Sequence, residues 1–94
     1  MPNNYNYLLS IDPNSVYDID KLKKKLDLCI DWARLFACTY LLYTTSKKEK
    51  LYSRFKEVLP NNKFFIVQVD LSQGEYTGWL TESRWNKIRE FKNK

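Results

Sequence analysis

The residue best placed for chemistry in this 94-residue chain is Asp12. It follows an apolar run at residues 7–11 and precedes Pro13, which has no N–H to donate to a β-ladder, so we expect Asp12 at the end of a strand. A carboxylate in that position suits a hard cation such as Mg²⁺, or a polar substrate. Asp before Pro is also common in turns. Two interpretations therefore stand: a catalytic and metal-binding Asp12, and a structural one.

Positive charge is the second feature that could act on a ligand. Sixteen Lys and Arg against eleven Asp and Glu give a net charge of +5, which favours an anionic partner such as RNA or DNA. The alternative is that the lysines form the solvated faces of helices. The candidates for phosphate contact are Lys21, Lys24, Lys25, Lys47 and Lys48.

The residue types that are scarce exclude several kinds of site. The chain has no His, which removes the usual general base, the serine triad and most zinc sites. Cys29 and Cys38 form no CxxC pair. With no signal-peptide pattern and no apolar run near 18 residues, we expect a cytoplasmic protein in a reducing compartment and no membrane partner.

The composition is typical of one globular domain over residues 1–94, with 44% hydrophobic and 29% charged residues. Three Trp, seven Tyr and five Phe are more aromatic residues than so small a core readily hides. We therefore expect some of them at a surface that meets a partner.

The first half of the chain predicts a strand, a helix and a hairpin. After Pro13, either Ser15 or Asp18 can cap a helix. Residues 32–36 and 39–45 favour two strands joined by a tight turn near 37–38. The apolar residues that mark the helix are Ile19, Leu22, Leu26 and Cys29.

The second half predicts a helix, a strand and a final helix. Ser46 and Glu49 have the spacing of a capping box, and the helix that follows should stop at Pro60. Residues 64–71 give the strongest strand pattern, and a C-terminal helix is expected at about 81–92.

Two short features of the second half have a local interpretation. Gly78-Trp79-Leu80 should anchor that last helix on the body of the protein, although a contact knob is the alternative. Asp70 is a second candidate acid, but we expect it to cap a turn.

This order of elements predicts an α+β, ferredoxin-like βαββαβ sandwich with a four-stranded antiparallel sheet and a short C-terminal helix. In that layout the first and third strands are central, and both long helices cover one face. The other face should then be covered by a second subunit, a nucleic acid or the C-terminal segment.

Three segments carry a resemblance to a known family: YLLSID at residues 7–12, TYLLYT at 39–44, and GWL at 78–80 before a Trp-bearing helix. Together they resemble the small bacterial SinR-family proteins, which are similar to the CRISPR-adaptation endoribonucleases. The resemblance implies a homodimer in which one acid from the end of each first strand lies near the two-fold axis. It further implies that the two acids hold a divalent cation, Mg²⁺, for phosphodiester cleavage. Asp12 is the residue that matches that position.

The function therefore stays open between two classes. The first is a small dimeric nucleic-acid-associated protein, either a metal-dependent nuclease or a non-catalytic relative. The second is a non-enzymatic dimeric regulator or inhibitor that binds a protein, encoded by a phage or mobile element. An RNA-binding sheet of stacked aromatic residues ranks third, because the chain lacks the K/R-G-F/Y-G/A-F-V-x-F/Y motif.

Overall fold

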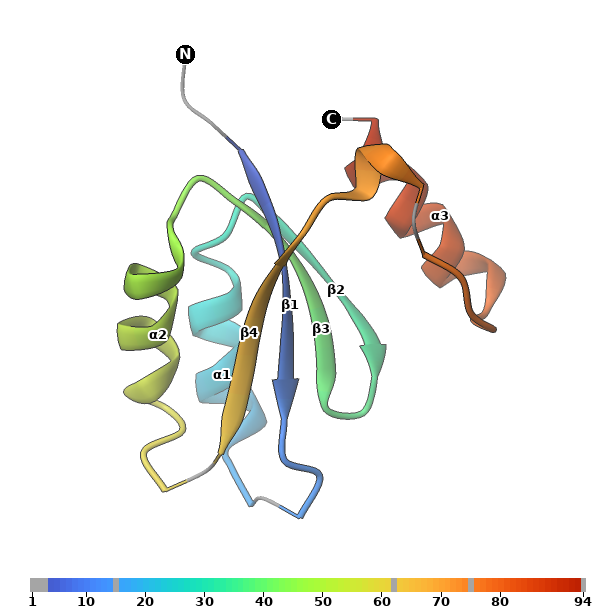
Figure 1. Cartoon of the computed structure of the whole chain (residues 1–94). Coiled ribbons are helices and arrows are strands. Elements are labelled where there is room, and N and C mark those ends of the chain that lie inside the picture. The colour runs from blue at the N-terminus through green and yellow to red at the C-terminus, as the bar shows by residue number, and fades with distance from the viewer. Residues whose placement is uncertain (1–3, 15, 62, 75, 94) are drawn as a thin grey trace.

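The computed structural model describes residues 4–14, 16–61, 63–74 and 76–93. Four strands form one antiparallel sheet in the order β2-β3-β1-β4, accompanied by three α-helices (Figure 1). The arrangement is a small α+β domain that is compatible with a ferredoxin-like fold. The elements are β1 (Tyr5–Ile11), α1 (Ile19–Leu26), β2 (Asp31–Phe36), β3 (Thr39–Thr44), α2 (Lys48–Lys56), β4 (Phe64–Val69), a 3₁₀ helix (Leu71–Gln73) and α3 (Glu82–Lys92).

Strand β1 is the centre of the sheet, antiparallel to β3 on one side and to β4 on the other. Successive side chains of a strand point to opposite faces, so β1 supplies apolar residues to both faces. Leu9 pairs with Tyr40 and Ile66 on the face that carries α1 and α2. Its neighbour Leu8 belongs to the opposite face.

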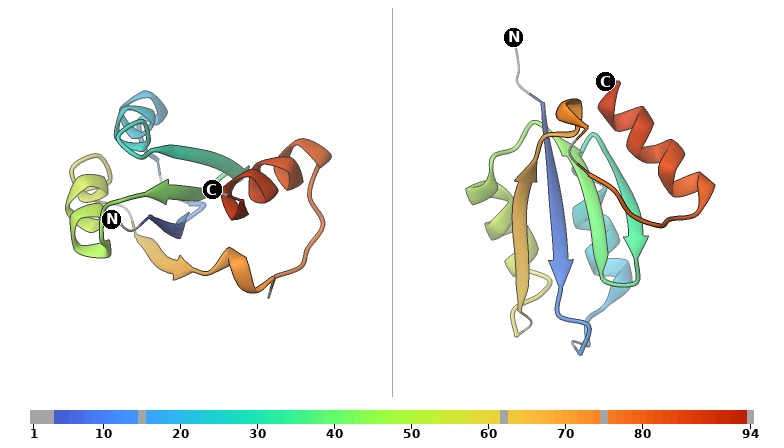
Figure 2. Two further views of the ribbon diagram at one scale, coloured as in Figure 1. Left: turned by 90° about the horizontal axis from the view of Figure 1, so that it is seen from above. Right: turned by 45° about the vertical axis from the view of Figure 1, so that its right-hand side comes forward.

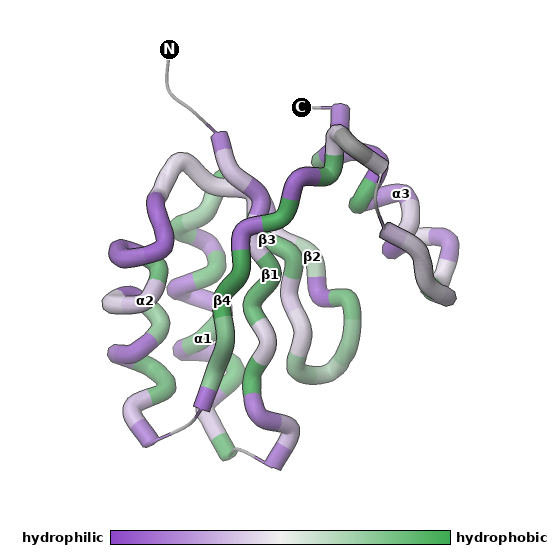
Figure 3. Tube along the Cα trace, viewed as in Figure 1, coloured by the Kyte–Doolittle hydropathy of each residue, from purple (hydrophilic) through white to green (hydrophobic). Residues whose placement is uncertain are grey.

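The larger core lies between the sheet and helices α1 and α2, which both pack on the same face (Figure 2). The helices are amphipathic, as the alternating colours along each of them show (Figure 3). Most of the stabilising apolar burial is here. Its fully buried members are Leu9, Leu22, Leu26, Leu42, Leu51, Phe55 and Leu59, each 0% exposed.

A second, smaller core forms on the opposite face, where α3 packs against β2 and β3. The rings of Tyr43 and Phe91 lie 5.9 Å apart, and Lys87 makes an ion pair of 3.4 Å with Asp31. Of the three occupants expected for this face, the C-terminal segment therefore takes the half over β2 and β3. The half over β1 and β4 is less covered, and Phe65 is 64% exposed there.

The predicted strands and the final helix lie where the sequence places them. The hairpin turns at residues 37–38, as predicted, with a shift of register between Arg34 and Phe36. Strand β4 ends at Val69, two residues early, because the Asp70 side chain caps the 3₁₀ helix that follows. Residues 76–80 form no strand in the part of the chain that the structure describes.

Helix α1 has the expected cap, and helix α2 does not. Asp18 caps α1 by accepting the N–H groups of Asp20 and Lys21, whereas the alternative cap, Ser15, lies outside the described residues. The prediction of a capping box at the start of α2 is wrong, because the Ser46 hydroxyl accepts a hydrogen bond from Arg54. The helix begins at Lys48 and has no side-chain cap.

None of the helices in the described part of the chain has the length and apolar character that crossing a bilayer requires.

The packing predicts a large loss of stability for Phe55→Ala. This ring is 0% exposed between α2 and the sheet, so its removal leaves a cavity that the fold cannot close. We expect the free energy of unfolding to fall by about 3–5 kcal/mol in urea titrations. Leu28→Ala is the control, because Leu28 is 60% exposed and should change stability by about 0.5 kcal/mol or less. Equal effects of the two substitutions would contradict this packing.

Candidate functional site

An apolar groove of about 570 Å³ lies between the open side of the sheet and the C-terminal segment. Its floor is made by one residue from each strand, all on the face away from α1 and α2. These are Leu8 of β1, Leu35 of β2, Leu41 of β3 and Val69 of β4.

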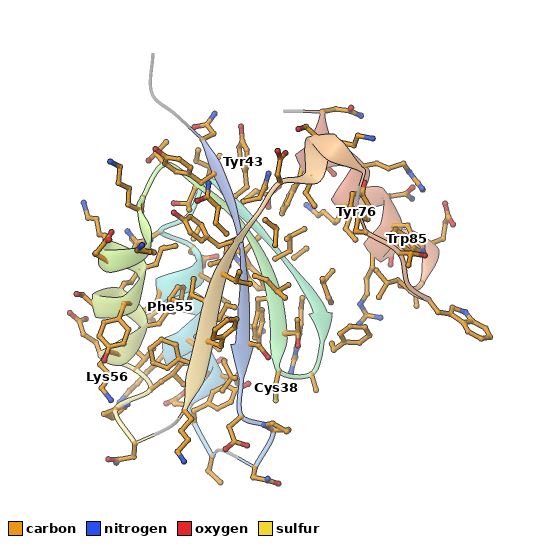
Figure 4. All side chains as sticks on the ribbon, viewed as in Figure 1. Cys38, Tyr43, Phe55, Lys56, Tyr76 and Trp85 are labelled. Atoms are coloured by element: carbon orange, nitrogen blue, oxygen red, sulfur yellow. The ribbon has the colours of Figure 1, made fainter. Side chains whose placement is uncertain are left out.

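The groove exists because the second core is incomplete. Trp85 and Ile88 of α3 form one wall, and Leu71 of the 3₁₀ helix forms part of the opposite one. Tyr76 and Trp85 stack with ring centroids 6.4 Å apart, and Figure 4 shows them together beside α3. This contact holds the connecting segment against the helix, so the rim of the groove is structured.

The most exposed large apolar residue of the rim is Trp79, which is 96% exposed. The prediction that Gly78-Trp79-Leu80 anchors α3 is wrong for this tryptophan. The anchor is Leu80, which is half-buried and packs against the second core together with Trp85. Neighbouring side chains of an extended segment point in different directions, so Leu80 packs inward while Trp79 faces solvent.

The chemistry of the groove suits an apolar or aromatic ligand. Among the described residues that line the groove, Asp70 is the one with a charge, and its Oδ1 accepts hydrogen bonds from the backbone N–H and the hydroxyl of Ser72. The expected turn-capping role of Asp70 is therefore confirmed. Pockets that are largely apolar with few polar groups are typical of binding sites.

Asp12 directly follows the central strand β1 and is half-buried. Its backbone N–H donates to the carbonyl of Lys63 at 2.9 Å, and its Oδ1 accepts the N–H of Asn14 at 3.0 Å. This side chain therefore closes a turn, which is the structural interpretation of the Asp-Pro pair.

A single copy of the chain does not fit Mg²⁺. A hard cation of this kind takes several oxygen ligands, and carboxylates supply the charge. Within residues 4–14, 16–61, 63–74 and 76–93, no three Cys, Asp or Glu side chains gather into a group that could hold a metal. A second copy of the chain could bring another carboxylate to Asp12.

The five candidate lysines do not converge on Asp12. Lys21 and Lys24 are exposed on α1, and Lys25 pairs with Glu57 at 2.5 Å. Lys47 and Lys48 lie beyond the C-terminal end of β3, which runs antiparallel to β1. These two lysines are therefore at the opposite end of the sheet from Asp12.

Comparison with known proteins adds no assignment: no protein family, no curated protein and no solved structure matches the chain. The resemblance to SinR-family proteins stays a prediction.

The sequence did not predict the groove as a site. The signal available was the consecutive apolar residues of β1, β2 and β3, which put apolar side chains on both faces of one sheet. That pattern shows that a second layer is required. It does not show how much of the face an 11-residue helix leaves uncovered.

The ion pair of Lys25 predicts a pH dependence of stability. The hydrogen bond and the charge of Lys25 lower the pKa of Glu57 below its usual value. Because the folded pKa is the lower one, the stabilisation is complete above the unfolded pKa and is lost as the pH falls through the folded pKa. The effect is small, because both side chains are partly solvated.

We therefore expect Glu57→Gln to lower the thermal unfolding midpoint slightly near neutral pH, and the difference from the wild type to close in acid. Thermal melts at a series of pH values measure this. Glu90→Gln is the control for the loss of one exposed carboxylate. A difference that widens in acid would contradict the ion pair.

Proposed function

We propose that this chain is a non-enzymatic protein-binding module, a regulator or inhibitor that receives a short apolar or aromatic segment of a partner protein. The observation that supports it is the groove of about 570 Å³ with Trp79 96% exposed at its rim. Binding hot spots are enriched in Trp and lie in well-packed pockets, so a surface Trp beside an apolar groove is typical of them.

The size of the groove fits a few side chains of a partner. Binding pockets of about 300–1,000 Å³ enclose ligands of drug size, which corresponds to two or three large residues. The exposed Trp79 and the half-exposed Phe36 both line the groove and would contact such a segment. The net charge of +5 favours a partner segment with acidic flanks.

We propose the ferredoxin-like assignment as the finer description of the fold. Its support is the sheet order β4-β1-β3-β2 with helices following β1 and β3. In this arrangement the groove side of the sheet is the face without the two crossover helices. Such a face is the natural position for a partner.

The groove can be tested with peptides selected from a random display library. Selection on the wild type, with excess Leu8→Lys as competitor, retains peptides that need the apolar floor. We expect apolar, aromatic-containing peptides whose affinity falls about tenfold or more with Trp79→Ala, which is a truncation of a hot spot. Titration calorimetry measures the affinities.

Tyr52→Ala is the matched control, because Tyr52 is 55% exposed on α2, away from the groove. Unfolding curves must show that Trp79→Ala is as stable as the wild type. If no groove-dependent peptide emerges, or if Trp79→Ala binds as tightly as the wild type, the proposal fails.

We propose nucleic-acid chemistry at Asp12 as the second candidate. It is supported by the position of Asp12 at the end of the central strand, which the family resemblance implies for a metal-binding acid. Two copies would have to bring their Asp12 carboxylates together across a two-fold axis to bind Mg²⁺. Either RNA or DNA is the substrate class.

The informative variant for this candidate is Asp12→Asn. It keeps an oxygen that can accept the N–H of Asn14 while removing the charge that a cation needs. We expect a loss of about 100-fold or more in Mg²⁺-dependent cleavage of labelled RNA or DNA. Asp20→Asn is the control, an exposed acid on α1. Unchanged cleavage by Asp12→Asn, or no cleavage by the wild type, would reject the candidate.

A further inference from the structure

The two edges of the sheet differ in how they are protected from pairing with another strand. Edge strand β2 carries the charged residues Asp31 and Arg34, and its register shifts between Arg34 and Phe36. Helix α3 also packs against it. Charges, irregular register and a covering helix are the devices that keep an edge strand from pairing.

Helix α2 contacts edge strand β4, but this strand lacks the charges and the irregular register of β2. It reads FFIVQV, without charge, Pro or Gly, and its six residues pair with β1 in unbroken register. Among the described residues no segment pairs with its outer side, because β4 is the last strand in the sheet order. A regular, uncharged and apolar edge is a template for a further strand.

The hydrogen-bonding groups on that outer side can be assigned. The Asp12 N–H donates to the Lys63 carbonyl, so residues 63, 65, 67 and 69 bond to β1 in the alternating antiparallel pattern. The backbone N–H and C=O groups of Phe64, Ile66 and Gln68 therefore point away from the sheet. These are the groups that another strand would bind.

We propose that the partner at this edge is a second copy of the chain, whose β4 pairs antiparallel with the first about a two-fold axis at Val67. The two sheets become one sheet of eight strands. Cross-strand neighbours must lie on the same face, and this axis satisfies that requirement. The two Val67 side chains lie opposite each other, and each Phe65 lies opposite the partner's Val69.

The side chains at this edge are complementary to their own copies. Phe65 is 64% exposed on the open face and gains an apolar neighbour. On the other face, Tyr52 is 55% exposed and its ring lies 5.6 Å from that of Phe64.

The buried area sets the expected strength. The exposed parts of Phe65 and Tyr52 amount to roughly 200–300 Å² per copy, since a large aromatic side chain carries about 150–250 Å². A stable interface takes about 800 Å² per partner, and the strand backbone and its flanks supply the rest. The joint is therefore of modest size, and we expect a dissociation constant of about micromolar order.

This surface is the outer edge of β4, which borders the groove at Val69, and it goes beyond the proposed function because it can be tested without a ligand. It also differs from the dimer that the family resemblance implies. Asp12 directly follows β1, which is one strand in from the edge. Its backbone pairs with Lys63, the residue before β4. The joint therefore keeps the two Asp12 carboxylates apart.

The first experiment measures mass by sedimentation velocity from about 1 to about 100 μM, the range in which a micromolar dimer forms. Gln68→Pro removes one outward N–H while leaving the residues that bond to β1 unchanged, and an edge strand tolerates Pro there. We expect the wild type to reach twice the chain mass, and Gln68→Pro to weaken the dimer at least tenfold. Phe36→Lys, on the exposed side of β2, should leave it intact.

The second experiment tests the register. Val67 is a non-hydrogen-bonded pair on the axis, where Cα atoms lie about 4.5 Å apart, within the range of a disulfide. In a Cys38→Ser background, Val67→Cys should form a covalent dimer on mild oxidation, and Phe36→Cys should not. Cys29 does not interfere, because it is buried and burial raises the pKa of its thiol.

A wild type that stays monomeric throughout this range overturns the proposal and leaves the edge to an extended segment of another protein. A dimer that Gln68→Pro does not weaken, or a Val67→Cys chain that does not cross-link, also overturns it. A mass above that of a dimer also overturns the proposal, because two-fold pairing of β4 with its copy uses the one open sheet edge of each chain. Gln68 and Val67 do not line the groove, so peptide affinity is measured independently of the dimer mass. Failure here is therefore distinguishable from failure of the proposed function.

Discussion

The structure depends on one constraint, the burial of apolar side chains of the central strand β1 on both faces of the sheet. Leu9 contributes to the core under α1 and α2, and Leu8 to the core under α3, so neither face of the sheet can be left to water alone. The larger core is complete, with two helices over it. The smaller core has the single helix α3, which reaches β2 and β3. The groove is the part of the second apolar face that this helix does not cover, and its position follows from the topology of the sheet.

The same constraint explains why the charged residues do not form a site. In a sheet with both faces apolar, the lysines and acids lie on helix surfaces and at strand ends. Antiparallel strands then separate groups that follow β1 from groups that follow β3, which places Lys47 and Lys48 far from Asp12. What the described surface presents together is apolar: a groove with an exposed Trp79 at its rim, and an edge strand with open backbone groups. Both features suit recognition of a polypeptide more directly than they suit catalysis.

Prediction from the sequence succeeded where the determinant was local. The strand at residues 64–69, the turn at 37–38, the cap at Asp18 and the helix from Glu82 all follow from periodicity and from preferences of single residues. It failed where a residue had a choice of partner. Ser46 was expected to cap α2, but its hydroxyl accepts a hydrogen bond from Arg54, which is 8 residues further along the chain. Trp79 was expected to be buried because Trp usually is, yet its neighbour Leu80 packs inward.

The sequence alone determined the number, order and type of the elements, because hydrophobic period and turn chemistry are properties of short segments. It also determined that the sheet has two apolar faces, because Tyr7, Leu8 and Leu9 are consecutive apolar residues and neighbouring side chains of a strand point to opposite faces. The tertiary structure alone decided which of the three expected occupants lies on the second face, how far α3 extends across it, and which edge of the sheet stays open. Those outcomes depend on contacts between residues distant in the chain, such as Tyr43 with Phe91, and a local pattern carries no information about them.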